Sequence, residues 1–206
     1  MSKTTSYIWI FPIVLIMGII GCTTSQPKYS GFLGDYSGLR PSVIEKGAEQ
    51  YFHPSKAIAD YDAFMIDPVR VQFARGSDAT AIDPAKILEL SVYFREKLIS
   101  QLRSGGYSVK DKSGRNTLTV RVAITGLKKT NPLLNIHPAT KMSGAGLGGA
   151  SFEGECVDSV TGERIAAVVH SKKGSRTSMK AGLSDWDHAK QAMDFWAETF
   201  VKNLKK

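Results

Sequence analysis

Hydrophobic and polar residues alternate with the two-residue period of a β-strand along several stretches of the chain. The clearest alternation lies at 117–124, where one face carries Leu118, Val120, Val122 and Ile124. Residues 63–74 show the same period once Asp67–Pro68 is read as a bulge or edge break. We also predict a short strand at 107–111 and two strands flanking a turn at 158–163, where Thr161–Gly162 supply the turn chemistry.

Two other stretches carry the helical period. At 83–104, Asp83 is placed to cap a helix, Pro84 suits its first position, and Gly105–Gly106 ends it. The apolar stripe of this helix consists of Ile87, Leu90, Phe94, Leu98 and Leu102. A second helix is predicted after Ser184, with Asp187 at the reciprocal position of a capping box. Its stripe consists of Trp186, Ala189, Met193, Trp196, Phe200 and Leu204.

The order strand, helix, several strands, helix predicts an α/β fold. We expect a two-layer sandwich, in which a mixed, mostly antiparallel sheet of about five strands carries two helices on one face. Residues 42–206 are expected to form a single globular domain. Phe94 and Trp196 are expected to be buried against the sheet, one from each helix.

The N-terminus, residues 1–21, has the layout of a bacterial lipoprotein signal peptide. Lys3 makes its start positive, and the apolar run 8–20 is shorter than the roughly 20 residues that span a bilayer. The run ends in Ile19, Ile20, Gly21 and Cys22, which resembles a lipoprotein box. That resemblance implies cleavage before Cys22 and attachment of acyl chains to Cys22, which would anchor the protein to a membrane. An uncleaved anchor or a chance cysteine is the alternative.

The residue after Cys22 indicates in which membrane the lipoprotein is expected. Thr23 stands where an Asp usually retains enterobacterial lipoproteins at the inner membrane. We therefore expect a lipid-anchored protein on the periplasmic face of the outer membrane.

Residues 22–41 join this anchor to the domain. A polar tether is followed by a Gly- and Tyr-rich segment without helical or strand period. This segment carries Phe32, Leu33, Asp35, Tyr36 and Leu39. We expect it to be a strap laid across the domain's own core. The alternative is a docking epitope presented close to the membrane.

The net charge of the chain and its Cys and His residues limit which functions are expected. The net charge is +8, but the basic residues are spread and lack interleaved aromatic residues, so we expect no nucleic-acid partner. The only cysteine besides Cys22 is Cys156, which alternation places on the face of Phe152 as a small buried hydrophobic residue. A reactive thiol is the alternative. The four histidines, His53, His137, His170 and His188, lack metal-site spacing.

Two catalytic or cofactor motifs match formally but lack their structural context. The G-x-G-x-x-G at 144–149 follows a loop and precedes a strand, whereas a dinucleotide site needs a strand before it and a helix after it. The S-x-x-K at 25–28 lies in the tether, without its partner motifs. Asp35, Asp67 and Asp158 fall at turns or caps, where Asp is normally structural. We therefore expect neither a catalytic residue nor a metal or cofactor.

A family resemblance rests on the lipobox together with "SGFLGDYSGL" and "GAGLGGASFEGECVDSVTGERIAAV". These stretches resemble the bacterial lipoproteins catalogued as domain of unknown function 3313, which have no established activity. The order of elements is also similar to envelope α/β domains that bind other envelope proteins or assemble. This implies a non-enzymatic, membrane-tethered binding protein with an envelope partner or with itself. An envelope enzyme or small-ligand carrier is the alternative, which a deep pocket with convergent polar groups would favour.

Overall fold

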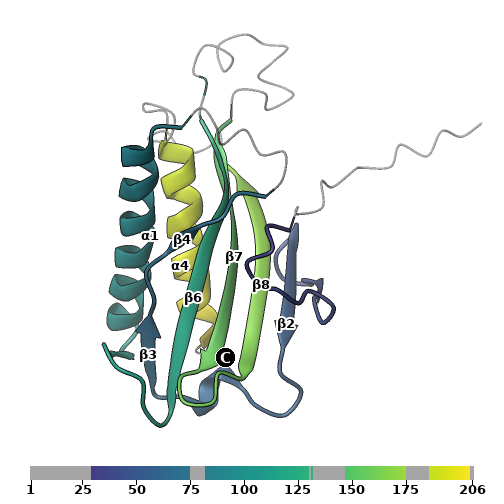
Figure 1. Cartoon of the computed structure of the whole chain (residues 1–206), viewed down its shortest axis with the longest axis vertical. Coiled ribbons are helices and arrows are strands. Elements are labelled where there is room, and N and C mark those ends of the chain that lie inside the picture. The colour runs from purple at the N-terminus through teal and green to yellow at the C-terminus, as the bar shows by residue number, and fades with distance from the viewer. Residues whose placement is uncertain (1–28, 75–81, 130, 132–146, 175–185, 205–206) are drawn as a thin grey trace, which may run out of the picture.

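The computed structural model describes residues 29–74, 82–129, 131, 147–174 and 186–204. Cys22, Ser184 and His137 lie outside these residues. The elements are, in chain order, β1 (Arg40–Pro41), β2 (Ala48–Phe52), the 3-10 helix η1 (Ile58–Asp60), β3 (Ala63–Ile66), β4 (Arg70–Val71), α1 (Pro84–Ser104), β5 (Ser108–Val109), β6 (Thr117–Lys128), β7 (Gly149–Asp158), β8 (Arg164–Lys173) and α4 (Asp187–Leu204) (Figure 1).

The described strands form one eight-stranded mixed sheet. Its order is β1-β2-β8-β7-β6-β3-β5, and β4 pairs with β6 further along that strand. The long neighbours β6, β7 and β8 are antiparallel to one another, as are β1, β2 and β8. The short strands β3, β4 and β5 join by parallel pairing. The predicted α/β fold with a mixed, mostly antiparallel sheet is therefore confirmed.

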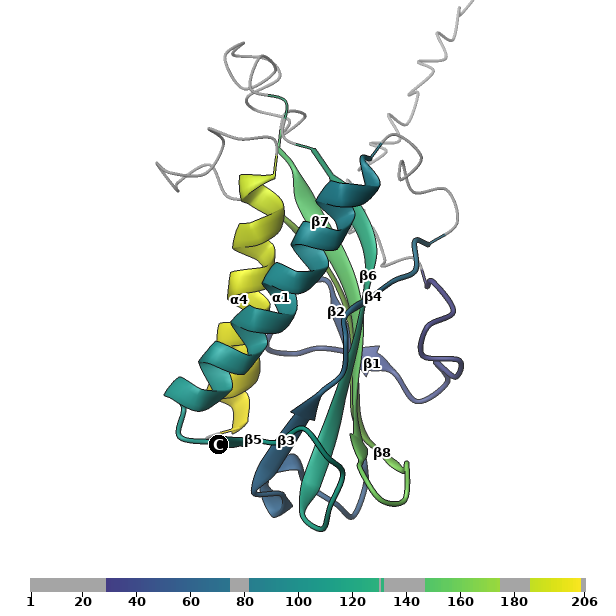
Figure 2. The same ribbon diagram turned by 60° about the vertical axis from the view of Figure 1, so that its left-hand side comes forward.

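Both helices lie on one face of this sheet and pack against each other (Figure 2). Helix α4 contacts β7 and β8, whereas α1 contacts β3 and β4. The ends of α1 follow the sequence signals: the Asp83 carboxylate accepts from the Ala85 amide at 2.9 Å, and Gly105 is the C-cap. Gly106 then adopts φ +87°, a left-handed conformation that favours glycine. Neither described helix is long and apolar enough to cross a bilayer.

The core fills the space between the helices and the sheet. The alternating residues of β6 are all buried there, as are most of the two helical stripes. Phe94 and Trp196 keep only 1% and 5% of their surfaces exposed, which confirms their expected burial. Their ring centroids lie 5.9 Å apart, and the Trp196 ring lies tilted against Phe152 of β7, with 4.3 Å between the ring centroids. Both helices thus share one core with the sheet.

The expected count of about five strands is wrong. The stretch 63–74 forms two strands, because the chain leaves the sheet between β3 and β4 at Asp67–Pro68. The segment 40–52 adds β1 and β2, which were not predicted. In β2 the alternating faces are Ala48, Gln50 and Phe52 against Glu49 and Tyr51. Each face mixes polar and apolar residues, so the strand lacks the hydrophobic alternation by which strands are recognised.

Candidate functional site

The strap, defined here as residues 29–39, lies on the face of the sheet opposite the helices, beside β8 and β2 (Figure 1). Leu33 and Leu39 are buried there against Ala167 and Val169 of β8. Phe32 and Tyr36 are half-buried around them, and Tyr51 of β2 completes this small cluster. Asp35 is exposed, and its carboxylate accepts from the Ser37 amide at 2.9 Å, which lowers the pKa of Asp35.

A fully buried carboxylate holds the strap. Glu153 of β7 has 0% exposure, and its Oε1 accepts from the Ser30 amide at 2.5 Å. Its Oε2 accepts from the Tyr36 hydroxyl at 2.6 Å and from the Leu33 amide at 3.3 Å. Burying a charge is costly unless it is hydrogen-bonded in this way. Burial, followed by the bond to Glu153, raises the pKa of Tyr36 to about 12, so this phenol remains a donor.

The strap also forms an internal hydrogen bond and is bound by a second charged residue, Arg164. The Tyr36 hydroxyl accepts from the Gly31 amide at 2.8 Å. Gly31 and Gly34 adopt φ +91° and +72°, which explains why this segment is rich in glycine. From β8, Arg164 donates to the backbone carbonyls of Leu33 at 2.5 Å and Asp35 at 2.9 Å. Sequence reasoning missed Glu153 and Arg164. One signal was available: the acids Glu153 and Glu155 lie on the strand face opposite to Phe152 and Cys156.

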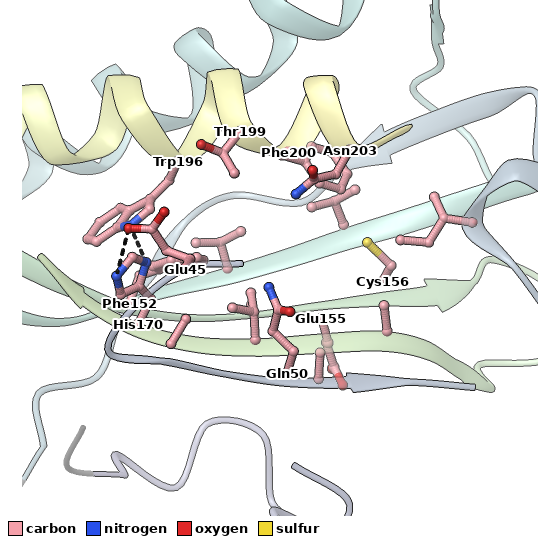
Figure 3. A pocket seen from close by; sticks show the side chains of 18 of the residues that line it. Glu45, Gln50, Phe152, Glu155, Cys156, His170, Trp196, Thr199, Phe200 and Asn203 are labelled. Atoms are coloured by element: carbon pink, nitrogen blue, oxygen red, sulfur yellow. Dashed lines mark hydrogen bonds and ion pairs between the residues drawn. The ribbon is translucent and has the colours of Figure 1, made fainter. Parts of the chain in front are cut away.

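A groove opens on the other face of the sheet, between α4 and β2 (Figure 3). It exists because α4 packs on β7 and β8, whereas β2 lies one strand further out. Its volume is about 290 Å³. Its walls come from three elements: Ala48, Gln50 and Phe52 of β2; Ala166, Val168 and His170 of β8; and Phe195, Trp196, Thr199, Phe200, Asn203 and Leu204 of α4.

A polar cluster closes one end of the groove. The Trp196 Nε1–H donates to Nδ1 of His170 at 3.0 Å, and His170 Nε2 lies 3.8 Å from Oε1 of Glu45 (Figure 3). Burial lowers the pKa of His170, so the neutral imidazole accepts from the indole. Lys172 Nζ lies 3.4 Å from Oε1 of Glu45 and 3.4 Å from the centre of the Phe195 ring.

The remaining surface of the groove is mainly apolar. Cys156 of β7 lies in its floor, and burial raises the pKa of this thiol to about 12. The predicted burial of Cys156 on the face of Phe152 is confirmed. Gln50, Thr199 and Asn203 contribute polar side chains along the walls, whereas Glu155, although adjacent, bonds to Arg164 on the opposite face. The groove was not anticipated from sequence, because it depends on where α4 lies relative to β2.

The other candidate residues from the sequence analysis form local hydrogen bonds in turns or lie in a strand. Asp158 accepts from the Val160 and Thr161 amides in the β7–β8 turn at 2.9 and 2.8 Å. His53 Nδ1 accepts from the Lys56 amide at 3.1 Å. Gly149, the last residue of the G-x-G-x-x-G motif, begins a strand. Within the described ranges, no three His, Cys, Asp or Glu side chains are grouped as metal ligands.

Comparisons with known proteins give relatives over most of the chain. The uncharacterized lipoprotein YdcL of Escherichia coli K12 is 23% identical over 209 residues, which cover 93% of each chain. Its counterpart in Escherichia coli O157:H7 matches equally.

Among solved structures, a PelC dodecamer from Paraburkholderia phytofirmans matches with a TM-score of 0.43 and 12% identity, over 73% of this chain and 96% of that one. A DUF4136 family protein from Bacteroides thetaiotaomicron matches with a TM-score of 0.41 and 10% identity, over 81% and 98%.

The family resemblance drawn from the sequence motifs is also confirmed. The family model described as "Protein of unknown function (DUF3313)" matches residues 28–200. This match includes the strap, the sheet, α1 and most of α4. The chain therefore belongs to the DUF3313 family.

Proposed function

We propose that this protein is a lipid-anchored binding protein on the periplasmic face of the outer membrane, and that it acts by binding rather than by catalysis. The lipobox at Cys22 and the lipoprotein YdcL of Escherichia coli support the anchor. Thr23, in place of the Asp that retains lipoproteins at the inner membrane, supports the outer membrane.

The groove between α4 and β2 is the observation that carries the binding function. It is concave and largely apolar, with a polar cluster at one end and a few polar side chains along its walls, which are the usual features of a binding site. Phe52 and Ile44, at its rim, are 63% and 65% exposed. Large apolar side chains beside an apolar groove favour a partner that removes them from water.

The chemistry of the same residues favours binding over catalysis. A catalytic cysteine needs a lowered thiol pKa, whereas burial raises that of Cys156. The Nδ1 lone pair of His170 is already taken by the Trp196 indole. A small-ligand carrier is the second candidate, and it is favoured by the enclosed, polar end of the groove at Glu45 and His170.

Replacing Cys22 with alanine is expected to abolish lipid anchoring of the protein in the outer membrane. The thiol that receives the diacylglycerol is then absent, so neither acylation nor cleavage before residue 22 can occur. Fractionation of the host envelope, with intact-mass analysis of the outer membrane fraction, measures this. Cys156→Ala serves as the matched control and should retain anchoring. A mature wild-type chain that lacks acyl mass, or begins elsewhere than Cys22, would contradict the anchor.

A photo-crosslinking residue at Asn203, at the rim of the groove, is expected to capture a ligand or partner in the intact envelope. The same residue at Leu88, which is 66% exposed on α1, is the control and should give no equivalent product. Thr199→Trp, which fills the groove from α4, should suppress the product from Asn203. Mass spectrometry of the adduct identifies a protein or a small molecule. Equal products from both positions, or an unaffected product in Thr199→Trp, would refute binding in the groove.

A further inference from the structure

We infer that the tip loop, residues 42–47 between β1 and β2, contacts the surface of the anchoring membrane, with Val43 and Ile44 inserted among its lipids. This inference rests on the proposed lipid anchor and adds a second, non-covalent membrane contact to it. The partner is a bilayer that contains anionic phospholipid.

The tip loop presents two apolar side chains to solvent in a defined shape. Val43 is 100% exposed and Ile44 is 65% exposed. The Ser42 hydroxyl accepts from the Ile44 and Glu45 amides at 3.2 and 3.0 Å, and the Ser42 amide donates to the Ala48 carbonyl at 2.9 Å. The loop is therefore held by its own hydrogen bonds, while the domain leaves its apolar tip in water. Transfer of such side chains out of water is favourable.

The docked strap limits how far the tip loop can lie from the membrane. The Tyr29 hydroxyl donates to Oε2 of Glu49 in β2 at 2.5 Å, and the Ser30 amide donates to the buried carboxylate of β7. Only residues 22–29 therefore separate the proposed anchor from the folded domain, which is at most about 25 Å of extended chain. The tip loop enters β2 at Ala48, directly before Glu49. It thus lies beside the point where the tether reaches the domain.

The charges around the tip loop suit an anionic surface. Both acids of residues 42–49 are already bonded, Glu45 to Lys172 at the end of β8 and Glu49 to a strap tyrosine. Lys46 in the loop and Lys173 in β8 are exposed, and neither forms an ion pair with a described residue. Two unpaired cations beside an apolar tip complement a bilayer with anionic lipids, which attracts lysines close to its surface.

A tethered domain needs only a weak contact of this kind. A short tether holds the tip loop near the bilayer at an effective concentration on the order of millimolar. The two apolar side chains offer only a small part of the roughly 1,000 Å² that a specific protein interface buries. A bilayer requires no complementary shape, so it fits the tip loop better than a protein partner or a second copy of the chain.

The contact is tested with the chain from Cys22 to Lys206, coupled through the Cys22 thiol to a maleimide lipid in vesicles that contain phosphatidylglycerol. The thiol of Cys156 is buried and does not compete. A fluorescent amino acid replaces Val43, and lipids with brominated acyl chains quench it where it enters the bilayer. Quenching is expected at position 43 but not at Val160, which is 67% exposed in the turn at the other end of β8. Equal quenching at both positions, or none at position 43, overturns the inference.

Partition of the untethered chain measures the apolar contribution. The chain from Thr23 to Lys206 is used, because the described residues share one core that includes both helices and the sheet. Val43→Ser/Ile44→Ser is expected to weaken partition onto phosphatidylglycerol vesicles about tenfold or more. Leu88→Ser/Val160→Ser removes side chains of the same size that are 66% and 67% exposed elsewhere, and should leave partition unchanged. Equal partition of the two double variants overturns the inference.

A third variant measures the contribution of charge. Lys46→Gln/Lys173→Gln is expected to weaken partition about tenfold or more on phosphatidylglycerol vesicles, but not on phosphatidylcholine vesicles. An equal effect on both kinds of vesicle overturns the selection of anionic lipid. All substituted side chains are exposed, so thermal melts of the variants should match that of the wild type.

The other outcomes are distinguishable. A dimer that Val43→Ser/Ile44→Ser dissociates in sedimentation assigns the tip loop to a second copy of the chain and overturns the inference. A photo-crosslink from position 43 to an envelope protein, without quenching in vesicles, assigns it to a protein and overturns the inference too. Maleimide coupling does not depend on acylation in the cell. An unquenched probe therefore overturns the loop contact alone, whereas a Cys22 that lacks acyl mass in the host contradicts the proposed anchor.

Discussion

Replacing Glu153 with alanine is expected to lower the free energy of unfolding by about 3 kcal/mol or more. The substitution leaves the Ser30 and Leu33 amides and the Tyr36 hydroxyl without their acceptor, beneath a strap that excludes water. Each buried donor without a partner costs about 1–3 kcal/mol. Urea denaturation of the chain from Thr23 measures the change.

Glu49→Ala is the matched control for this prediction. Glu49 also accepts from a strap tyrosine, Tyr29, but at an exposed position. Its loss should therefore cost no more than about 1 kcal/mol. Glu153→Gln should fall between the two, because the amide keeps one acceptor oxygen and the shape of the side chain. If Glu153→Ala and Glu49→Ala are equally stable, the strap does not contribute to the stability of the domain.

Replacing Trp196 with alanine is expected to cost about 3–5 kcal/mol. The indole lies 4.3 Å from the Phe152 ring and 5.9 Å from the Phe94 ring, so its removal leaves a cavity between α4 and the sheet. It also leaves Nδ1 of buried His170 without a donor. Thermal and urea unfolding, compared with wild type, measure the loss.

Two variants separate the packing of Trp196 from its hydrogen bond. Trp196→Phe keeps an aromatic ring but removes the donor to His170, and this should cost about 1–3 kcal/mol. Phe195→Ala removes the neighbouring aromatic side chain, which is only half-buried, and should cost less than Trp196→Ala. An unchanged melting temperature in Trp196→Ala would show that the indole does not support the core.

The elements with strong local signals could be predicted from the sequence. Asp83 and Gly105 determine the ends of α1 through contacts within a few residues. The alternation of β6 reflects the large apolar side chains on the face that enters the main core, although most residues of its other face are buried as well. In contrast, β2 could not be recognised, because Gln50 faces the groove and Tyr51 faces the strap. Neither face of β2 is purely apolar, so its place in the sheet depends on tertiary contacts.

The residues of the candidate site were harder to predict than the fold. Tyr36 and Glu153 are 117 positions apart, so nothing near either residue indicates that they meet. The groove depends on the position of β2 beyond α4, which follows from the strand order. His170 lies within β8, and its bond to Trp196 requires that β8 and α4 lie face to face, which no local pattern indicates.

The strand order also determines the sequence in which the domain can be completed as the chain is synthesised. β2 pairs with β1 and β8, and the strap docks on Glu153 and on β8, the last described strand of the chain. A chain that is made N-terminus first exposes the strap and β2 before these partners arrive. Closing so long a loop is entropically slow. The strap is thus synthesised early but can dock only after more than a hundred residues have followed it.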